Sequence, residues 1–151
     1  MKRLANIEDK NIEACTKIYI KTYAKDPWNE QYDFDIVHNH IKKFISKDSN
    51  HGWVLYQEEN AIGIILGIII PALGGDYFRI EDLCISPSSQ GLGYGSEFIK
   101  MISNELRSYK VDSIILNTVK EFPSYKFYLK NKFTEINTSI TLYLDLTDEK
   151  N

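Results

Sequence analysis

The order of the elements predicted along this chain indicates an α/β protein, with a central mixed β-sheet of six or seven strands and helices on both faces. Three observations support this class. Apolar residues recur at helical spacing in the first third of the chain. From residue 52 to 85 they recur at every second position, as in β-strands. The rest of the chain alternates between helical and strand spacing. Such an order typically builds one sheet that is covered by helices on both sides.

The first third begins with a short strand, expected over residues 2–5. Asn6 or Asp9 can cap a helix that runs to about Ala24, because side chains of this kind accept hydrogen bonds from free N–H groups at a helix start. Asp33 is expected to begin a second helix in the same way.

The middle of the chain is predicted to form strands at 53–57, 62–70 and 77–85. The second is apolar on both faces, as a central buried strand should be. A helix over 96–109, a strand over 113–117, a short helix over 123–130 and a final alternating strand over 140–146 complete the predicted order. The final strand could pair across a homodimer.

Size and composition fit a single domain over residues 1–151, since 43% of the residues are hydrophobic and 26% are charged. A net charge of −3 with no basic cluster gives no sign of nucleic-acid binding. The longest apolar run, 62–70, is too short to cross a membrane, and no secretory signal follows Met1. Two cysteines and the spacing of His38 and His40 predict no metal site, and a cytoplasmic location is expected.

A glycine-rich loop is the most informative segment. Gly91, Gly93 and Gly95 follow a predicted strand and precede a predicted helix. Glycines let a ligand approach the backbone closely, and a helix start adds free N–H donors, so the loop predicts a phosphate seat. Ser96-Glu97 after the last glycine excludes the Walker pattern, and the even spacing excludes the dinucleotide fingerprint. A glycine-rich turn without a ligand is the plain alternative.

Two motifs resemble the GNAT superfamily of N-acetyltransferases. Its acyl-CoA loop resembles Leu83-x-Ile85-x-Pro87-x-x-Gln90-Gly91-x-Gly93-x-Gly95, and its Phe-Tyr-x-Lys-x-Gly-Phe segment resembles Phe127-Tyr128-Leu129-Lys130-Asn131-Lys132-Phe133. The resemblance implies the GNAT fold and an acetyltransferase that uses acetyl-CoA as co-substrate and needs no metal. Lys132 stands where the family has glycine, so Asn131 is expected to take the left-handed conformation that ends the helix.

The resemblance also assigns residues to acetyl-CoA. Backbone N–H groups from Gln90 to Gly95 would hold its pyrophosphate, and an N–H near Cys84 or Ile85 would face the thioester carbonyl. The full set of cofactor-binding candidates is Leu83, Cys84, Ile85, Gln90, Gly91, Leu92, Gly93, Tyr94, Gly95, Ser96, Asn117 and Ser124.

Acetyl transfer to an amine also needs a base and an acid. Glu81 and Asp82 lie on the strand before the loop, and neighbouring strand residues point to opposite faces. A flat strand would favour Asp82, whereas the family often bends this strand and places its acid where Glu81 falls. Both therefore stay candidates for the general base, with Glu81 preferred. By the same resemblance, Tyr128 is the candidate general acid. Cys84 has no histidine near it in the sequence and is flanked by Leu83 and Ile85, so it is expected to be a packing residue.

The acceptor site is less defined. Trp28 could form one side of the acceptor site, and Glu30 could attract a cationic amine. The segment around Trp28 resembles that of GNAT proteins related to aminoglycoside 6′-acetyltransferases. The expected function is direct transfer of acetyl to a primary amine of a small molecule. The alternatives are a non-catalytic acyl-CoA-binding or regulatory module on the same fold, transfer of a longer acyl group, and acetylation of a protein N-terminus or lysine.

Overall fold

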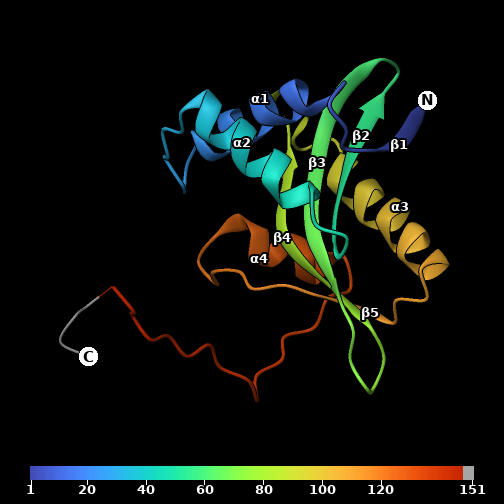
Figure 1. Cartoon of the computed structure of the whole chain (residues 1–151), viewed down its shortest axis with the longest axis vertical. Helices are drawn as coiled ribbons and strands as arrows, with labels where there is room; N and C mark the ends of the chain where they lie inside the picture. Colours follow the sequence, from blue (N-terminus) through green and yellow to red (C-terminus); the bar gives the residue numbers. More distant parts are fainter. Residues whose placement is uncertain (148–151) are drawn as a thin grey trace.

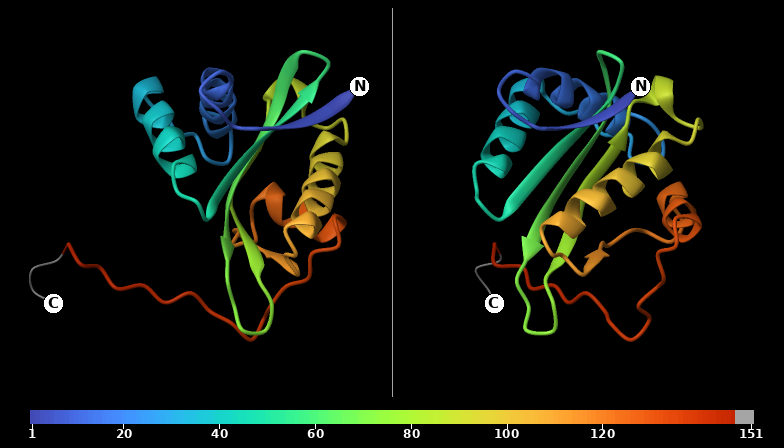
Figure 2. Two further views of the ribbon diagram at one scale, coloured as in Figure 1. Left: turned by 45° about the vertical axis from the view of Figure 1, so that its right-hand side comes forward. Right: turned by 90° about the vertical axis from the view of Figure 1, so that its right-hand side faces the viewer.

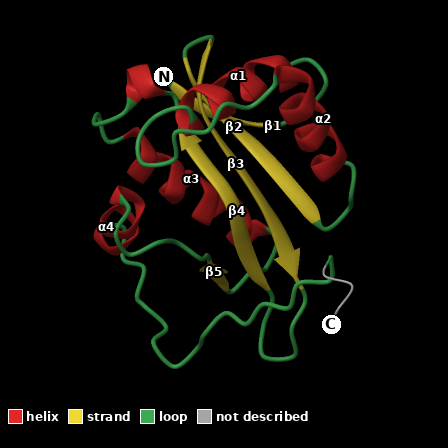
Figure 3. Ribbon diagram, turned by 90° about the vertical axis from the view of Figure 1, so that its left-hand side faces the viewer, coloured by secondary structure: helices red, strands yellow, loops and turns green. Residues whose placement is uncertain are grey.

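The structure is a computed structural model that describes residues 1–147. Its strands form one sheet in the order β1-β2-β3-β4-β5. The strands are β1 (Lys2–Asn6), β2 (Asn50–Gln57), β3 (Asn60–Ile70), β4 (Tyr77–Ile85) and β5 (Ser113–Ile115). The first four pair antiparallel, whereas β5 runs parallel to β4 at the edge of the sheet (Figure 3). The sheet is therefore mixed, as predicted.

Helices cover both faces of the sheet (Figures 1 and 2). One face carries α1 (Ile12–Tyr23) and α2 (Phe34–Ile45), and the other carries α3 (Tyr94–Ser108) and α4 (Pro123–Lys130). A short 3₁₀ turn, η1 (Pro87–Ser89), joins β4 to α3. None of the helices in residues 1–147 combines the length and apolar character needed to span a bilayer.

Strand β3 separates two apolar cores and contributes to both. Ile64 and Leu66 are fully buried against α1 and α2, where Ile41 packs. Ile65 is fully buried on the opposite face with Phe98 of α3. Burial of both faces explains why this strand reads as a continuous apolar run.

The helix starts were predicted in part. Asp33 caps α2, because its Oδ1 accepts hydrogen bonds from the backbone N–H groups of Asp35 and Ile36. The cap of α1, however, is Asn11 rather than Asn6 or Asp9. The buried Asn11 amide donates to the Asn6 carbonyl and accepts from the Glu8 N–H, so it holds together the turn that leads into the helix.

The strand count differs slightly from the prediction, because the described part of the chain contains five strands where six or seven were expected. The final strand expected over 140–146 is an extended segment without strand pairing. It leaves the body of the protein after the turn at residues 137–138 (Figure 1). Alternating residues define a face, but a strand also needs main-chain partners, and no described segment supplies them here.

Candidate active site

Two of the three glycines in the loop have a backbone conformation that favours glycine. Gly91 and Gly93 have φ angles of 76° and 83°, in the left-handed region that other residues enter only at a cost. Gly93 is the N-cap residue, immediately before the first residue of α3. The Gln90 amide donates to the Ile85 carbonyl at 2.9 Å and fastens the loop to the end of β4.

Six successive main-chain N–H groups in this loop are unpaired. Those of residues 91–96 donate to no acceptor in residues 1–147, and the first helical bond runs from the Glu97 N–H to the Gly93 carbonyl. No described side chain caps α3. These donors and the positive end of the helix dipole together make a strong site for an anion.

The side chains of the loop leave this row of N–H groups open. Leu92 is 65% exposed, and a Cβ added at Gly91 or Gly93 would meet no heavy atom within 4 Å. Tyr94 lies beneath the Lys2 ammonium, which is 4.9 Å from the centre of the ring. Ser96 occupies the first turn of α3.

At position 95, glycine is required by side-chain packing. A Cβ at this position would lie 2.9 Å from the ring of Phe127. Gly95 therefore allows α3 and α4 to approach each other closely. This packing requirement is independent of any ligand, and it separates Gly95 from the two glycines with left-handed backbones.

A β-bulge separates the two candidate carboxylates. In the β3–β4 ladder, Ile80 pairs with Gly67 and Asp82 pairs with Leu66, so Glu81 is the extra residue. A bulge reverses the alternation of side chains on the strand beyond it. As a result Ile80 and Leu83 contact the α3 core, while Asp82 turns towards α1.

Asp82 lies in a partly buried pair with a tyrosine of α1. The Tyr23 hydroxyl donates to Asp82 Oδ1 at 2.7 Å. Burial raises the pKa of Asp82, and the hydrogen bond from Tyr23 opposes that rise by stabilising the carboxylate. Burial likewise raises the pKa of Tyr23, so its hydroxyl stays protonated and remains a donor.

Glu81 is more accessible. Its side chain is 36% exposed and forms an ion pair with Arg79, whose Nε lies 2.6 Å from Glu81 Oε1. The pair is local, since Arg79 is two residues away on the same strand. Glu81 can therefore exchange protons with solvent, whereas Asp82 is largely enclosed.

The sheet opens between β4 and β5 beside these carboxylates. Pairing of the two strands ends at Arg79 and Ile115, so the rest of β4 pairs with no strand of residues 1–147 on that side. The Ser86 N–H donates to the Ile62 carbonyl of β3 at 2.8 Å. Because main-chain groups alternate along a strand, the N–H groups of Leu83 and Ile85 point away from β3 into the opening, and that of Cys84 points towards β3.

A cavity of about 180 Å³ lies at this opening. Its lining brings together several predicted residues from distant parts of the chain: Trp28, Glu81, Asp82, Leu83, Asn117, Ser124 and Tyr128. Ser124 is held by a hydrogen bond of 2.8 Å between its hydroxyl and that of Thr118. The cavity thus joins two carboxylates and a phenol next to the open edge of β4.

Tyr128 contributes a phenol to the lining of the cavity. Its ring packs against Phe127 and Phe133, with centroids 5.1 Å apart in each pair. Its hydroxyl has no hydrogen-bond partner among residues 1–147. Burial, and then the nearby Cys84 and Asp82, raise the pKa of Tyr128, so the phenol is protonated at neutral pH.

Aromatic side chains close the side of the cavity that faces α1. Trp28 meets Tyr23 and Phe122 edge-on, with centroids 5.4 and 5.9 Å away. Tyr23 and Phe122 also line the cavity, and neither was predicted from the sequence. The sequence did not indicate that Tyr23 belongs to the site, because Tyr23 follows the same helical spacing as the core residues of α1.

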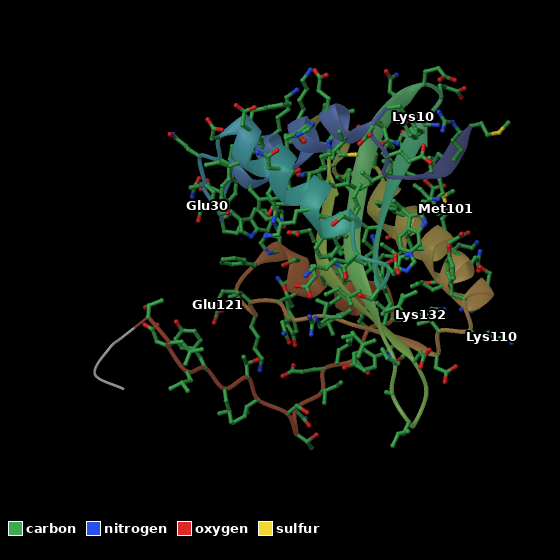
Figure 4. All side chains as sticks on the ribbon, viewed as in Figure 1. Lys10, Glu30, Met101, Lys110, Glu121 and Lys132 are labelled. Carbon is green, nitrogen blue, oxygen red and sulfur yellow. The ribbon has the colours of Figure 1, made fainter. Side chains whose placement is uncertain are left out.

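Two other predicted residues lie away from the cavity. Glu30 is exposed on the loop between α1 and α2 (Figure 4) and is absent from the cavity lining. Cys84 is fully buried against α1 and α2, and burial raises the pKa of its thiol, so it remains protonated. An inert packing role fits this environment.

The end of α4 corrects one expectation. Asn131 keeps a negative φ of −92°, and Lys132 takes the left-handed conformation with a φ of 69°. The Asn131 amide donates to the Phe127 carbonyl at 2.8 Å, which ties that residue to the last turn. Lys132 therefore occupies the backbone conformation for which glycine is better suited.

Comparison with solved structures identifies the fold. A possible acetyltransferase from Clostridium difficile 630 has a TM-score of 0.82 at 12% identity, covering 97% of this chain and 99% of that one. A GNAT family acetyltransferase from Staphylococcus aureus has a TM-score of 0.75 at 16% identity, covering 95% and 98%. AAC(6')-Iy in complex with the bisubstrate analog CoA-S-monomethyl-acetylneamine has a TM-score of 0.75 at 15% identity, covering 96% and 98%.

Sequence comparisons establish the family. A search of curated proteins finds no significant match. Residues 12–133, which span the helices, the sheet from β2 onwards, the glycine loop and Tyr128, match the acetyltransferase (GNAT) family. The chain therefore belongs to the GNAT family and is an acetyltransferase.

Proposed function

We propose that this acetyltransferase transfers the acetyl group of acetyl-CoA directly to a primary amine of a small-molecule acceptor. The observation that carries the proposal is the row of unpaired N–H groups over residues 91–96, in the loop that follows β4, the strand from which two carboxylates line a cavity that also holds a phenol. Such a row suits the diphosphate of coenzyme A. Acetyl-CoA supplies the acetyl group as a thioester.

Three groups of the chain would act on the reacting atoms. The Ile85 N–H, directed into the opening of the sheet, would donate to the carbonyl oxygen as negative charge develops there. Glu81 would take a proton from the amine, which is mostly an ammonium ion at neutral pH. Tyr128 would donate a proton to the sulfur as the carbon–sulfur bond breaks and the carbon–nitrogen bond forms.

Glu81 is the better base because it reaches solvent. A base must release each proton it takes. One oxygen of each carboxylate is already engaged, by Arg79 at Glu81 and by Tyr23 at Asp82, but only Glu81 is exposed. We assign Asp82 the role of positioning Tyr23 and of adding negative charge that favours an ammonium ion in the cavity.

The acceptor is expected to be small and cationic. The cavity of about 180 Å³ is lined by the aromatic rings of Trp28 and Phe122 and by the carboxylates of Glu81 and Asp82. Aromatic faces and carboxylates both attract alkylammonium groups. An amine on a protein N-terminus or on lysine is the competing acceptor.

A thiol-release assay with acetyl-CoA tests the function. We expect turnover with one or more small primary amines in a panel of polyamines, amino acids and aminosugars, and slower release with peptides. Release with peptides alone would contradict the small-molecule acceptor. Binding of acetyl-CoA without release for any amine would contradict catalysis of the proposed kind.

The base assignment has its own test. Glu81→Gln should lower kcat by about a hundredfold and remove the acidic limb of the pH–rate profile, as expected for loss of a general base. Asp82→Asn should mainly raise KM for the amine. A reversed pattern would make Asp82 the base, and an unchanged profile in both variants would exclude carboxylate catalysis.

The aromatic wall is tested by Trp28→Ala. We expect KM for the amine to rise about tenfold, with KM for acetyl-CoA unchanged, because one face of the cavity would be removed. Phe34→Ala is the control, since Phe34 is an aromatic residue of α2 that does not line the cavity. An unchanged KM in Trp28→Ala would remove Trp28 from the acceptor site.

A further inference from the structure

Two threonines of α1 are buried, and their hydroxyl groups have different partners. The Thr16 hydroxyl donates to the Ile12 carbonyl, one turn earlier in the same helix, at 2.8 Å. This is a common bond for a threonine inside a helix. The Thr22 hydroxyl instead donates to the Ile85 carbonyl, 63 positions away, at 3.4 Å. Thr22 is 5% exposed, so its contact ties the end of α1 to the end of β4 in an environment from which water is largely excluded.

The Ile85 carbonyl accepts hydrogen bonds from two side chains that come from different parts of the fold. Besides Thr22 of α1, the Gln90 amide of the glycine loop donates to it at 2.9 Å. The next N–H group, that of Ser86, donates to the Ile62 carbonyl of β3 at 2.8 Å. The peptide unit between Ile85 and Ser86 is therefore held by β3, by the glycine loop and by α1.

This peptide unit adjoins the N–H group assigned to the thioester carbonyl. The N–H and the carbonyl of one residue in an extended strand point to the same side, so both groups of Ile85 face the opening between β4 and β5. Ile85 is the last residue of β4, and at this point β4 pairs with β3 but with no strand of residues 1–147 on its other side. The ends of elements open more easily than their centres. The bonds from Thr22 and Gln90 restrain Ile85 from the side that lacks a strand.

The Cys84 thiol also lies close to Thr22. Cys84 is fully buried, and burial raises the pKa of its thiol, so the sulfur stays protonated. A thiol sulfur is a weak acceptor, whereas a main-chain carbonyl oxygen is a strong one. The Ile85 carbonyl is therefore the partner that sets the direction of the Thr22 hydroxyl.

We propose that Thr22 is a positioning residue for acetyl transfer, because its hydroxyl fixes the end of β4 with the Ile85 N–H aimed at the thioester carbonyl. This inference rests on the role given to the Ile85 N–H in the proposed function. A hydrogen-bond donor stabilises the developing negative charge most strongly when it is already held in place before the reaction. Thr22 acts through the backbone of Ile85 and takes no part in the bonds that form and break.

Thr22→Val tests the positioning role, because it removes the hydroxyl and keeps a branched side chain. The Ile85 carbonyl retains its bond from Gln90, so the fold should be preserved. We expect kcat to fall about tenfold with KM for acetyl-CoA unchanged, since a misplaced donor lowers the rate of the chemical step. Thr22→Ala should behave in the same way and replaces the valine variant if valine is not tolerated. Thr22→Ser keeps the hydroxyl and should restore most of kcat.

Thr16→Val is the matched control, because it removes the other buried hydroxyl of α1, which bonds within its own helix. Its kcat should equal that of the wild type. An equal loss of kcat in Thr16→Val and Thr22→Val would mean that packing of α1 is responsible and would overturn the positioning role. An unchanged kcat in Thr22→Val would do the same.

Infrared spectroscopy of bound acetyl-CoA, isotopically labelled at the thioester carbonyl, separates this inference from the proposed function. A hydrogen bond to a carbonyl lowers its stretching frequency, and the measurement needs neither an acceptor nor turnover. The band should lie at lower frequency in the wild type and Thr22→Ser than in Thr22→Val. Equal bands in the wild type and Thr22→Val would overturn the inference. Absence of turnover with every amine would contradict the proposed function, and the band would still decide the role of Thr22.

Discussion

Replacement of Gly93 by aspartate should remove acetyl-CoA binding and leave the fold intact. In the free protein the substitution costs little. A left-handed backbone destabilises an L-residue by about 1–2 kcal/mol, and aspartate by less. A negative charge at the start of α3 stabilises the helix by about 0.3–1 kcal/mol. No heavy atom lies within 4 Å of the added Cβ. We therefore expect the free energy of unfolding to change by less than about 1 kcal/mol, a small part of the usual total.

The bound state should respond much more strongly. One carboxylate about 5 Å from one phosphate charge, at an effective dielectric constant of about 20, repels it by about 3 kcal/mol. This energy weakens binding at least a hundredfold, since about 1.4 kcal/mol corresponds to a factor of ten. The aspartate side chain would also occupy the space over the unpaired N–H groups.

Isothermal titration with coenzyme A measures the effect. Gly74→Asp is the matched control, because Gly74 also has open space around its Cβ position and lies in the turn between β3 and β4, away from the glycine loop. Affinity should fall in Gly93→Asp and remain unchanged in Gly74→Asp. Wild-type affinity in Gly93→Asp would refute the assignment of this loop to the diphosphate.

Three further variants test the chemistry and the stability of the fold. Tyr128→Phe should lower kcat about a hundredfold without changing KM for acetyl-CoA, because it removes only the proposed proton donor; steady-state kinetics with full turnover would end that role. Lys132→Gly should raise the free energy of unfolding by up to about 1 kcal/mol in urea titrations, since Lys132 has a left-handed backbone with φ of 69°; a less stable variant would contradict this account of strain. Asp82→Asn should gain stability relative to wild type as pH rises through 3.8, the ordinary pKa of aspartate. Burial raises the folded pKa of Asp82, so the unfolded chain releases this proton first and is favoured at higher pH; a pH-independent difference between the two proteins would contradict the raised pKa.

Local signals in the sequence predicted much of the fold. The bounds of β4 (Tyr77–Ile85) and α4 (Pro123–Lys130) match the structure at both ends, and Asp33 caps α2 as expected. Each of these features depends on neighbouring residues, through apolar spacing, a proline at a helix start or a side chain that bonds nearby N–H groups.

Features that depend on distant partners were missed or only partly predicted. Tyr23 donates to Asp82, 59 positions away, so nothing near either residue in the sequence marks the pair. The segment 140–146 has the alternation of a strand, yet it joins no strand of the sheet among the described residues. The alternation of apolar residues alone cannot show whether the edge of another strand is available to pair with this segment.

The sequence by itself determined the glycine loop, because left-handed glycines followed by a helix start produce a row of free N–H groups from local geometry. It also determined that two acids would precede that loop. Only the tertiary structure decided how they are arranged: the register of β4 against β3 makes Glu81 the bulged residue and turns Asp82 towards Tyr23. A bulge arises from the pairing of two strands, and that pairing is a property of the folded sheet.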